Sequence, residues 1–367
     1  MNQSNGKIGI REYVALVILI IGTKLADNTP AILYEKMDNA AWMSPIIIGI
    51  SSVIPIYFLL KVLSLYPDKG LMDVFKHLCG KYIGYLIVLV LWLIGSFAII
   101  IDSAIYTDII GTMYFTKTPT LILYLVLMGV SAYGAKKGLE QIGSVALSVI
   151  FYIKITLFVA LILSFKQGNI NYLFPILGQG HWDILKESSL KLSLFGEFLY
   201  LGIIASNIKS FKYYRKGTWI SLIILTIELP VAIASFLILY DYEPLKLVNY
   251  PFHETIRYLS LGFLTNIETF FFPFWLISAF VRFSLYLYLS GMMFGWLFKI
   301  KNFEYVIPSL ATLFVFLGMI PETPTFQIYH LRDNLLTLIT PFYFFLPILL
   351  WVIAKLKGET KNDKSDR

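Results

Sequence analysis

The chain has 367 residues, of which 57% are hydrophobic and only 14% charged, and its formal net charge is +7. Soluble domains usually carry about 25% charged residues, so this composition excludes an ordinary soluble protein and predicts a multi-pass membrane protein. The mean hydropathy of +0.73 agrees. The basic residues are scattered in short loops and at helix ends, which favours topology signals and lipid headgroup contacts over nucleic-acid binding.

Cysteine and histidine usage argues against cofactor chemistry. The single cysteine, Cys79, excludes an intramolecular disulfide, and the four histidines do not have metal-ligand spacing. No nucleophile stands with a base. We therefore expect no cofactor, no metal and no enzymatic activity.

At about 20 apolar residues per crossing, the sequence predicts ten transmembrane helices in two sets of five. The first set comprises residues 10–34, 44–65, 83–113, 119–134 and 142–164. The second set comprises residues 187–206, 218–240, 264–295, 304–320 and 335–355. A linker from Phe165 to Glu187 separates them. We expect one transmembrane domain (1–367) with a first five-helix repeat (10–164), a second repeat (187–356) and a cytoplasmic tail (357–367).

The orientation of the two repeats follows from counting and charge. Because five is odd, the second repeat enters the membrane from the face opposite to the first, so the repeats are inverted. Most lysines and arginines fall on the side of the two termini, and the positive-inside rule therefore predicts that both termini lie in the cytoplasm.

Two apolar segments, the first of each repeat, are interrupted near the middle. The first interruption is Gly22, Thr23 and Lys24, and the second is Gly196, Glu197 and Phe198. Gly22 lies roughly 18 Å from one face and Gly196 roughly 14 Å from the other, at 1.5 Å per residue. Half-helix ends at such breaks offer free N–H groups and free carbonyls, which suit the carboxylate and the ammonium of an amino acid. A substrate site at the bilayer midplane, formed by these residues, is therefore predicted.

Ionisable side chains within or beside the spans indicate where function is concentrated. They are Lys24, Asp27, Asp102, Asp108, Lys154, Lys191, Glu197, Glu228, Glu268 and Arg282. Four of them, at positions 27, 108, 191 and 228, are close enough to an interface to be solvated. Glu197 is the strongest candidate for ligand binding, and it could equally be a structural tether that holds the break open. Lys24 could neutralise Glu197 or a ligand carboxylate, or extend toward a face.

The other four central charges are candidates for proton transfer or ion pairing. Lys154, in the fifth span, could carry a proton or act as a fixed positive charge. Asp102, Glu268 and Arg282 are the plausible partners of Lys154 and Lys24. Glu268 and Arg282 lie about 21 Å apart along one helix and cannot pair with each other.

Four sequence stretches resemble a known family. They are Ile10-Arg11-Glu12-Tyr13 leading to Gly22-Thr23, Leu173-Phe174-Pro175-Ile176-Leu177-Gly178, Phe195-Gly196-Glu197, and 251–259 leading to Asn266-Ile267-Glu268. The chain resembles the amino acid/polyamine/organocation transporter superfamily, and more specifically the B subunit of bacterial spore germinant receptors. The resemblance implies a LeuT-like all-α membrane fold of ten helices in two inverted repeats, with helices 1 and 6 broken.

The resemblance also implies a function. It points to a spore inner-membrane protein that recognises a small germinant, such as an amino acid, in a complex with A-type and C-type subunits. An ordinary proton-coupled amino acid permease is the alternative, because the broken helices and Lys154 would serve it equally well.

Overall fold

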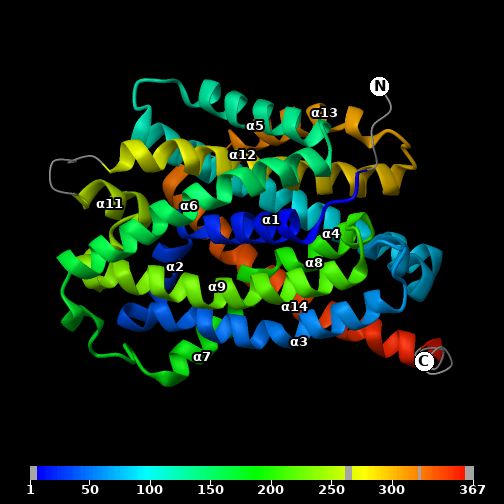
Figure 1. The fold of residues 1–367 in the computed structure, drawn as a ribbon, viewed down its shortest axis with the longest axis horizontal. Helices are drawn as coiled ribbons and strands as arrows, with labels where there is room; N and C mark the ends of the chain where they lie inside the picture. Colours follow the sequence, from blue (N-terminus) through cyan, green and yellow to red (C-terminus); the bar gives the residue numbers. More distant parts are fainter. Residues whose placement is uncertain (1–5, 261–266, 321–323, 360–367) are drawn as a thin grey trace.

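The computed structural model describes residues 6–260, 267–320 and 324–359, and in the last range side chains are described from residue 330 onward. The described chain is a bundle of helices that lie side by side along its long axis (Figure 1). The start of α1 and the end of α14 lie at the same end of the bundle, which we call the terminal end. Residues 264–266 of the predicted eighth span, including Asn266, and residues 360–367 of the tail fall outside the described residues.

The elements follow the chain in two groups. The first group is α1 (Ile10–Gly22), η1 (Thr23–Leu25), α2 (Thr29–Met37), η2 (Asp38–Met43), α3 (Ser44–Ser64), α4 (Leu71–Ile109), η3 (Ile110–Tyr114), α5 (Thr120–Lys136) and α6 (Leu139–Gln167). The second group is η4 (Ile170–Leu173), α7 (His181–Leu190), η5 (Leu192–Phe195), α8 (Glu197–Leu201), η6 (Gly202–Asn207), α9 (Phe211–Tyr240), α10 (Tyr242–Lys246), α11 (Pro251–Tyr258), α12 (Glu268–Phe298), η7 (Phe303–Tyr305), α13 (Ile307–Gly318) and α14 (Pro324–Leu356).

Long apolar helices confirm a multi-pass membrane protein. Within the described residues, six helical stretches are long and apolar enough to cross a bilayer: Thr29–Ser64, Leu71–Tyr114, Leu139–Gln167, Phe211–Tyr240, Glu268–Phe298 and His330–Leu356. A pair bent by 50°, His181–Leu190 with Leu192–Asn207, would make a seventh, and Thr120–Lys136 and Phe303–Gly318 are apolar but shorter. The all-helical architecture is therefore confirmed, and the count of ten crossings stays a prediction.

Both predicted interruptions are present as breaks in helices. α1 ends at Gly22, a single 3-10 turn follows, and α2 begins at Thr29. In the second repeat the helical path is interrupted from Lys191, where α7 has ended, and Gly196 joins the 3-10 turn η5 to α8. The second interruption thus begins five residues before the expected glycine and is longer than the sequence suggested.

α4 contains a short helical segment before the part that corresponds to the predicted span 83–113. Gly80 has a φ of +82°, in the region that favours glycine, and it separates residues 71–79 from the rest of α4. A Cβ on Gly84 would lie 2.7 Å from the Cα of Lys76, eight residues earlier, which a continuous helix would not allow. Residues 71–79 therefore fold back against the main part of α4 at the terminal end.

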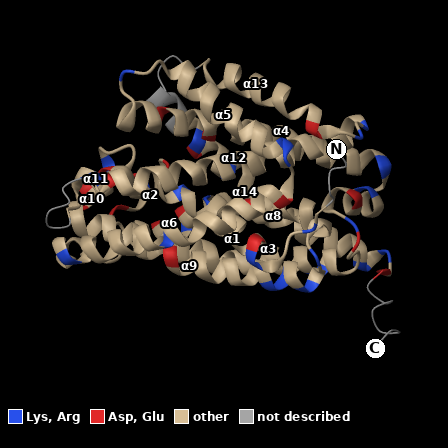
Figure 2. Cartoon of the chain, turned by 45° about the horizontal axis from the view of Figure 1, so that its top comes forward, with Lys and Arg blue, Asp and Glu red and all other residues tan. Residues whose placement is uncertain are grey.

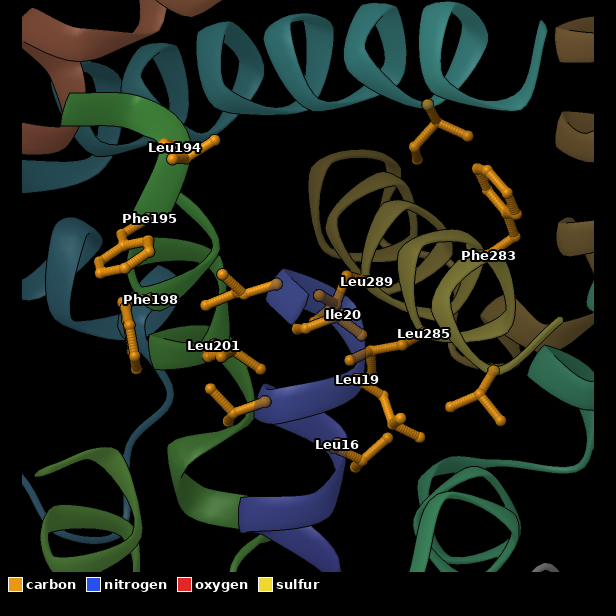
Figure 3. Packing of buried hydrophobic residues seen from close by; sticks show 14 of the residues in the cluster. Leu16, Leu19, Ile20, Leu194, Phe195, Phe198, Leu201, Phe283, Leu285 and Leu289 are labelled. Atoms are coloured by element: carbon orange, nitrogen blue, oxygen red, sulfur yellow. The ribbon is translucent and has the colours of Figure 1, made fainter. Parts of the chain in front are cut away.

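α1 lies in the middle of the bundle, where it packs against α6, α9 and α12. Every residue from Ala15 to Ile21 is buried, so the helix is surrounded on all sides. Figure 3 shows Ile20 of α1 beside Leu201 of α8, with Leu285 and Leu289 of α12 on the other side. The backbone also joins the two broken segments, because the N–H of Ile8 donates to the carbonyl of Asn207 at 3.2 Å and the N–H of Lys209 donates to Ile8 at 3.0 Å.

The short helices α10 and α11 lie at the opposite end of the bundle (Figure 2). Lys246 forms an ion pair of 2.6 Å with Asp38, and Arg257 donates to the carbonyl of Met113 at 2.7 Å. His253 of α11 is buried, and the loss of hydration lowers its pKa to about 3, so its ring is neutral at physiological pH. The contact of Lys246 fastens the connection between α9 and α12 onto the segment after α2, and that of Arg257 fastens it onto η3 at the end of α4.

Candidate functional site

The two breaks meet through an ion pair between Lys24 and Glu197. The Lys24 ammonium lies 2.6 Å from Glu197 Oε1 and also donates to the carbonyl of Leu194 at 2.7 Å. The hydroxyl of Tyr286 on α12 donates to the same carboxylate at 2.7 Å. Because Leu194 is in η5, its carbonyl is one of those left free by the irregular helix. The first break thus supplies a cation, Lys24, that binds both a backbone carbonyl and a side-chain carboxylate of the second break.

A second charged cluster lies beside this pair and joins four side chains from four elements. Arg282 of α12 donates to Asp102 of α4 at 2.6 Å, and Arg332 of α14 donates to Asp27 of the first break at 2.8 Å. Arg332 also pairs with Asp102, and Arg282 lies 3.9 Å from Asp27. None of the four side chains is more than 7% exposed. We call Asp27, Asp102, Arg282 and Arg332 the charged quartet.

The quartet fixes the broken first helix. Asp27 accepts the backbone N–H of Thr29, the first residue of α2, at 2.8 Å, while its other oxygen accepts from Arg332. The carbonyl of Thr23 accepts the hydroxyl of Tyr106 at 2.9 Å, and its side chain accepts from Arg282 at 3.0 Å. The polar groups released by the break are therefore largely satisfied from α4, α12 and α14.

The formal charges of the whole network cancel. Three cations, Lys24, Arg282 and Arg332, stand against three carboxylates, Asp27, Asp102 and Glu197. Isolated charges in a low-dielectric interior are costly, whereas paired and hydrogen-bonded ones are tolerated. The network can therefore accept a ligand of zero net charge without leaving an uncompensated charge.

A cavity of about 90 Å³ adjoins the network on the side of the terminal end. Lys24, Glu197, Asp102 and Arg332 line it at the charged side. The remaining wall is mostly apolar and comes from α1, α4, α8, α12 and α14: Ile20, Ala98, Ile99, Leu201, Leu289, Met293, Leu335, Leu336 and Ile339 are among its residues. Its volume exceeds that of a single water site several-fold, so it has room for a small molecule with one polar and one apolar end.

A smaller cavity, of about 40 Å³, lies on the other side of the first break. Gly22 and Thr23 line it together with Lys154 of α6 and Glu228 of α9. The Lys154 ammonium contacts both carboxylate oxygens of Glu228. The partner of Lys154 is therefore a carboxylate on α9, which the sequence did not suggest. Of the expected partners, Asp102 pairs with Arg282 and Arg332, and Glu268 pairs with Arg257.

The predicted site residues divide between several places. Lys24, Gly196 and Glu197 line the larger cavity, whereas Gly22 and Thr23 line the smaller one. Phe198 is buried outside both, with its ring 6.2 Å from that of Phe195 (Figure 3).

The remaining candidates are accounted for by their ion pairs. Asp102 and Arg282 belong to the charged quartet. Glu268 lies at the start of α12, where its carboxylate accepts from Arg257 at 3.2 Å, far along the helix from the quartet.

Two of the side chains expected to be solvated are buried. Asp27 has no exposed surface, because Arg282 and Arg332 enclose it. Lys191 is likewise buried and pairs with Asp333, and its ammonium donates to Thr337 at 2.9 Å. Both expectations were wrong because each residue lies at a helix break, where α14 packs. Most other charges gather at the two ends of the bundle (Figure 2).

Sequence reasoning missed Arg332 and Tyr286. Arg332 stands just before the predicted tenth span, whereas α14 already includes it. Two charges within three residues of an apolar run, in Arg332-Asp333-Asn334-Leu335-Leu336, are the available signal. Tyr286 carries no charge, so hydropathy does not distinguish it from the other aromatic residues of the predicted eighth span.

The fold and this site define a multi-pass membrane protein with a LeuT-type transporter fold. A substrate-bound, outward-open Na⁺-coupled sialic acid symporter superposes with a TM-score of 0.60 at 13% identity, over 94% of this chain and 80% of that one. A mutant manganese transporter of Eremococcus coleocola gives 0.52 at 13% identity, over 94% and 89%. These likenesses concern the fold alone.

The chain belongs to the spore germination protein family, whose family model matches residues 11–327. It is similar to three proteins of Bacillus subtilis (strain 168). Spore germination protein KB is 23% identical, over 98% of both chains. Spore germination protein YndE is 22% identical, over 92% of this chain and 94% of its own, and spore germination protein A2 is 22% identical, over 97% and 98%.

Proposed function

We propose that this protein is the membrane-embedded B subunit of a spore germinant receptor and that it binds a small zwitterionic germinant, an amino acid, between the two broken helices. The observation that carries the proposal is the meeting of both breaks at the Lys24–Glu197 pair, on the wall of a cavity that is otherwise mostly apolar. Membership of the spore germination protein family supports the physiological role.

The pair offers both charges that a zwitterion needs. A ligand carboxylate would take the Lys24 ammonium, and a ligand ammonium would take the Glu197 carboxylate, which Tyr286 already orients. The ligand then exchanges one ion pair for two, so no charge is left unpaired. Its side chain would point along the apolar wall toward the terminal end.

Binding at this place can act on the receptor as a whole. The pair and the quartet together connect the first break, the second break, α4, α12 and α14, so a ligand that separates Lys24 from Glu197 changes contacts on all of them. A ligand shifts a conformational equilibrium only by its differential contacts with the two states, and these contacts provide such a difference. We place the protein in the spore inner membrane with both termini in the cytoplasm, together with A-type and C-type subunits.

The test uses Glu197→Gln in a strain that lacks the native gene. We expect the variant protein to be detectable in spores and the amino acid response, normalised to protein abundance, to be lost, since the substituted amide cannot balance a ligand ammonium. Glu268→Gln is the matched control, because that carboxylate lies at the start of α12 away from the cavity. A normal response in Glu197→Gln spores would refute the site.

A proton-coupled amino acid permease is the second candidate, and the Lys154–Glu228 pair beside the first break favours it. In proteoliposomes, a permease would accumulate an amino acid in response to a pH gradient, and Lys154→Met would abolish this coupling. Coupled uptake at ordinary transporter rates, combined with unaltered germination of the deletion strain, would replace the receptor proposal.

A further inference from the structure

The connection between the cavity and the charged quartet is asymmetric. Of the four quartet residues, Asp102 and Arg332 line the cavity, whereas Asp27 and Arg282 do not. Arg332 is 2% exposed and stands with its guanidinium between two carboxylates, Asp27 on one side and Asp102 on the other. Any carboxylate that enters the cavity therefore meets Arg332 at the place where Asp102 already pairs with it.

The guanidinium of Arg332 also has a spare donor. One terminal nitrogen serves Asp102 and the other serves Asp27 and Thr29, the latter at 3.3 Å. Within the described residues, Nε has no hydrogen-bond partner, although it is buried. An unpaired buried donor costs free energy, and a carboxylate is its strongest acceptor.

We propose that Arg332 is the second anchor of the ligand carboxylate and that Asp102 occupies this anchor, as an internal substitute, while the cavity holds no ligand. The inference rests on the proposed function in taking the larger cavity as the ligand site. A ligand carboxylate displaces Asp102 from Arg332, and the ligand ammonium restores the charge balance at Glu197. Arg332 and Asp102 thereby make the site selective for carboxylates that carry their own positive charge.

The physical reason for this selectivity is the balance of three cations and three carboxylates. A carboxylate without an ammonium adds one negative charge to a balanced, desolvated network and is rejected. Removal of the Asp102 charge leaves the network with one excess cation next to the cavity. The same simple carboxylate then supplies the missing charge and binds better.

The experiment measures equilibrium binding of radiolabelled probes to the purified full-length protein. The probes are L-alanine, propionate, which lacks the ammonium, and ethylamine, which lacks the carboxylate. We expect Asp102→Asn to bind propionate at least tenfold more tightly than the wild type, and Asp102→Asn with Arg332→Gln to lose this gain. A role of Asp102 in stability alone would weaken every probe, so the sign of the change separates the two explanations.

Arg332→Lys is the second variant and keeps the charge while removing the planar set of donors. It is expected to weaken L-alanine about tenfold and to leave ethylamine unchanged. Asp333→Asn is the matched control. Asp333 is the next residue of α14, lies outside the cavity lining and pairs with Lys191, so its substitution should leave propionate binding at the wild-type level.

Equal propionate affinity in the wild type and Asp102→Asn would overturn the inference, as would a gain that persists when Arg332 is replaced. Equal losses of L-alanine and ethylamine in Arg332→Lys would also overturn it. If the wild type binds no amino acid but Asp102→Asn binds propionate, the carboxylate anchor stands and the proposed germinant class falls.

Discussion

The Lys24–Glu197 pair permits a double-mutant cycle whose outcome follows from its burial. The two side chains are 5% and 13% exposed, so either partner alone becomes an uncompensated charge in a low-dielectric site. Removal of one member of a buried pair costs about 3–5 kcal/mol. Since a glutamine at position 197 still accepts from Lys24, which also keeps the carbonyl of Leu194, we place Glu197→Gln at the lower end, about 3 kcal/mol.

The complementary variant, Lys24→Met, removes the paired cation and leaves a carboxylate that keeps the hydrogen bond from Tyr286. We expect it to cost about 4 kcal/mol. The double variant contains no unpaired charge, so its loss should be smaller than the sum of the single losses by about 2 kcal/mol or more. Unfolding of the purified protein in mild detergent, followed by tryptophan fluorescence, measures all three losses.

Additive losses would refute the reasoning, because they would mean that the two side chains do not pair. The pair of Lys186 and Glu187, 3.9 Å apart and with the lysine largely exposed, is the control cycle, for which additivity is expected. The ligand response should be absent in all three Lys24 and Glu197 variants, since none of them contains both charges.

Three further outcomes follow from the structure. Gly196→Ala would place a Cβ 2.9 Å from a backbone oxygen, whereas the Cβ of Gly22→Ala would lie 3.7 Å from its nearest atom. In a germination assay only Gly196→Ala should therefore impair the response, and equal responses of the two variants would contradict this. Lys154→Met leaves the carboxylate of Glu228 unpaired, so it should lower the unfolding midpoint, and adding Glu228→Leu should recover most of the loss; no recovery would exclude the pairing. Burial lowers the pKa of His253 to about 3, below its ordinary 6.5, so the unfolded chain takes up the proton first as the pH falls. The free energy of unfolding should therefore fall by about 2 kcal/mol between pH 6.5 and 5. His253→Gln should remove that part of the pH dependence in thermal unfolding, and an unchanged slope would show that the ring is not held neutral.

The composition and periodicity of the chain were sufficient to predict an all-helical membrane protein with two broken helices. A break shows in the sequence because glycine followed by a polar residue cannot stay in a lipid-exposed helix, and its depth follows from a fixed rise per residue. The same reasoning selected Lys24, Glu197, Asp102 and Arg282 as buried charges, since hydropathy shows any charge inside a span. These residues do lie in the two charged groups at the breaks.

Only the tertiary structure decided which charges pair. Lys154 meets Glu228 and not Asp102, and Arg332 joins Asp27 to Asp102, because a partner is set by the rotation and packing of helices that are far apart in sequence. Hydropathy measures how costly a charge is in the membrane, but it contains no information on which neighbouring helix compensates it. The sequence therefore predicted a site at two helix breaks, whereas the packing of α4, α12 and α14 around these breaks decided their charge balance and hence the chemistry of the ligand that we propose.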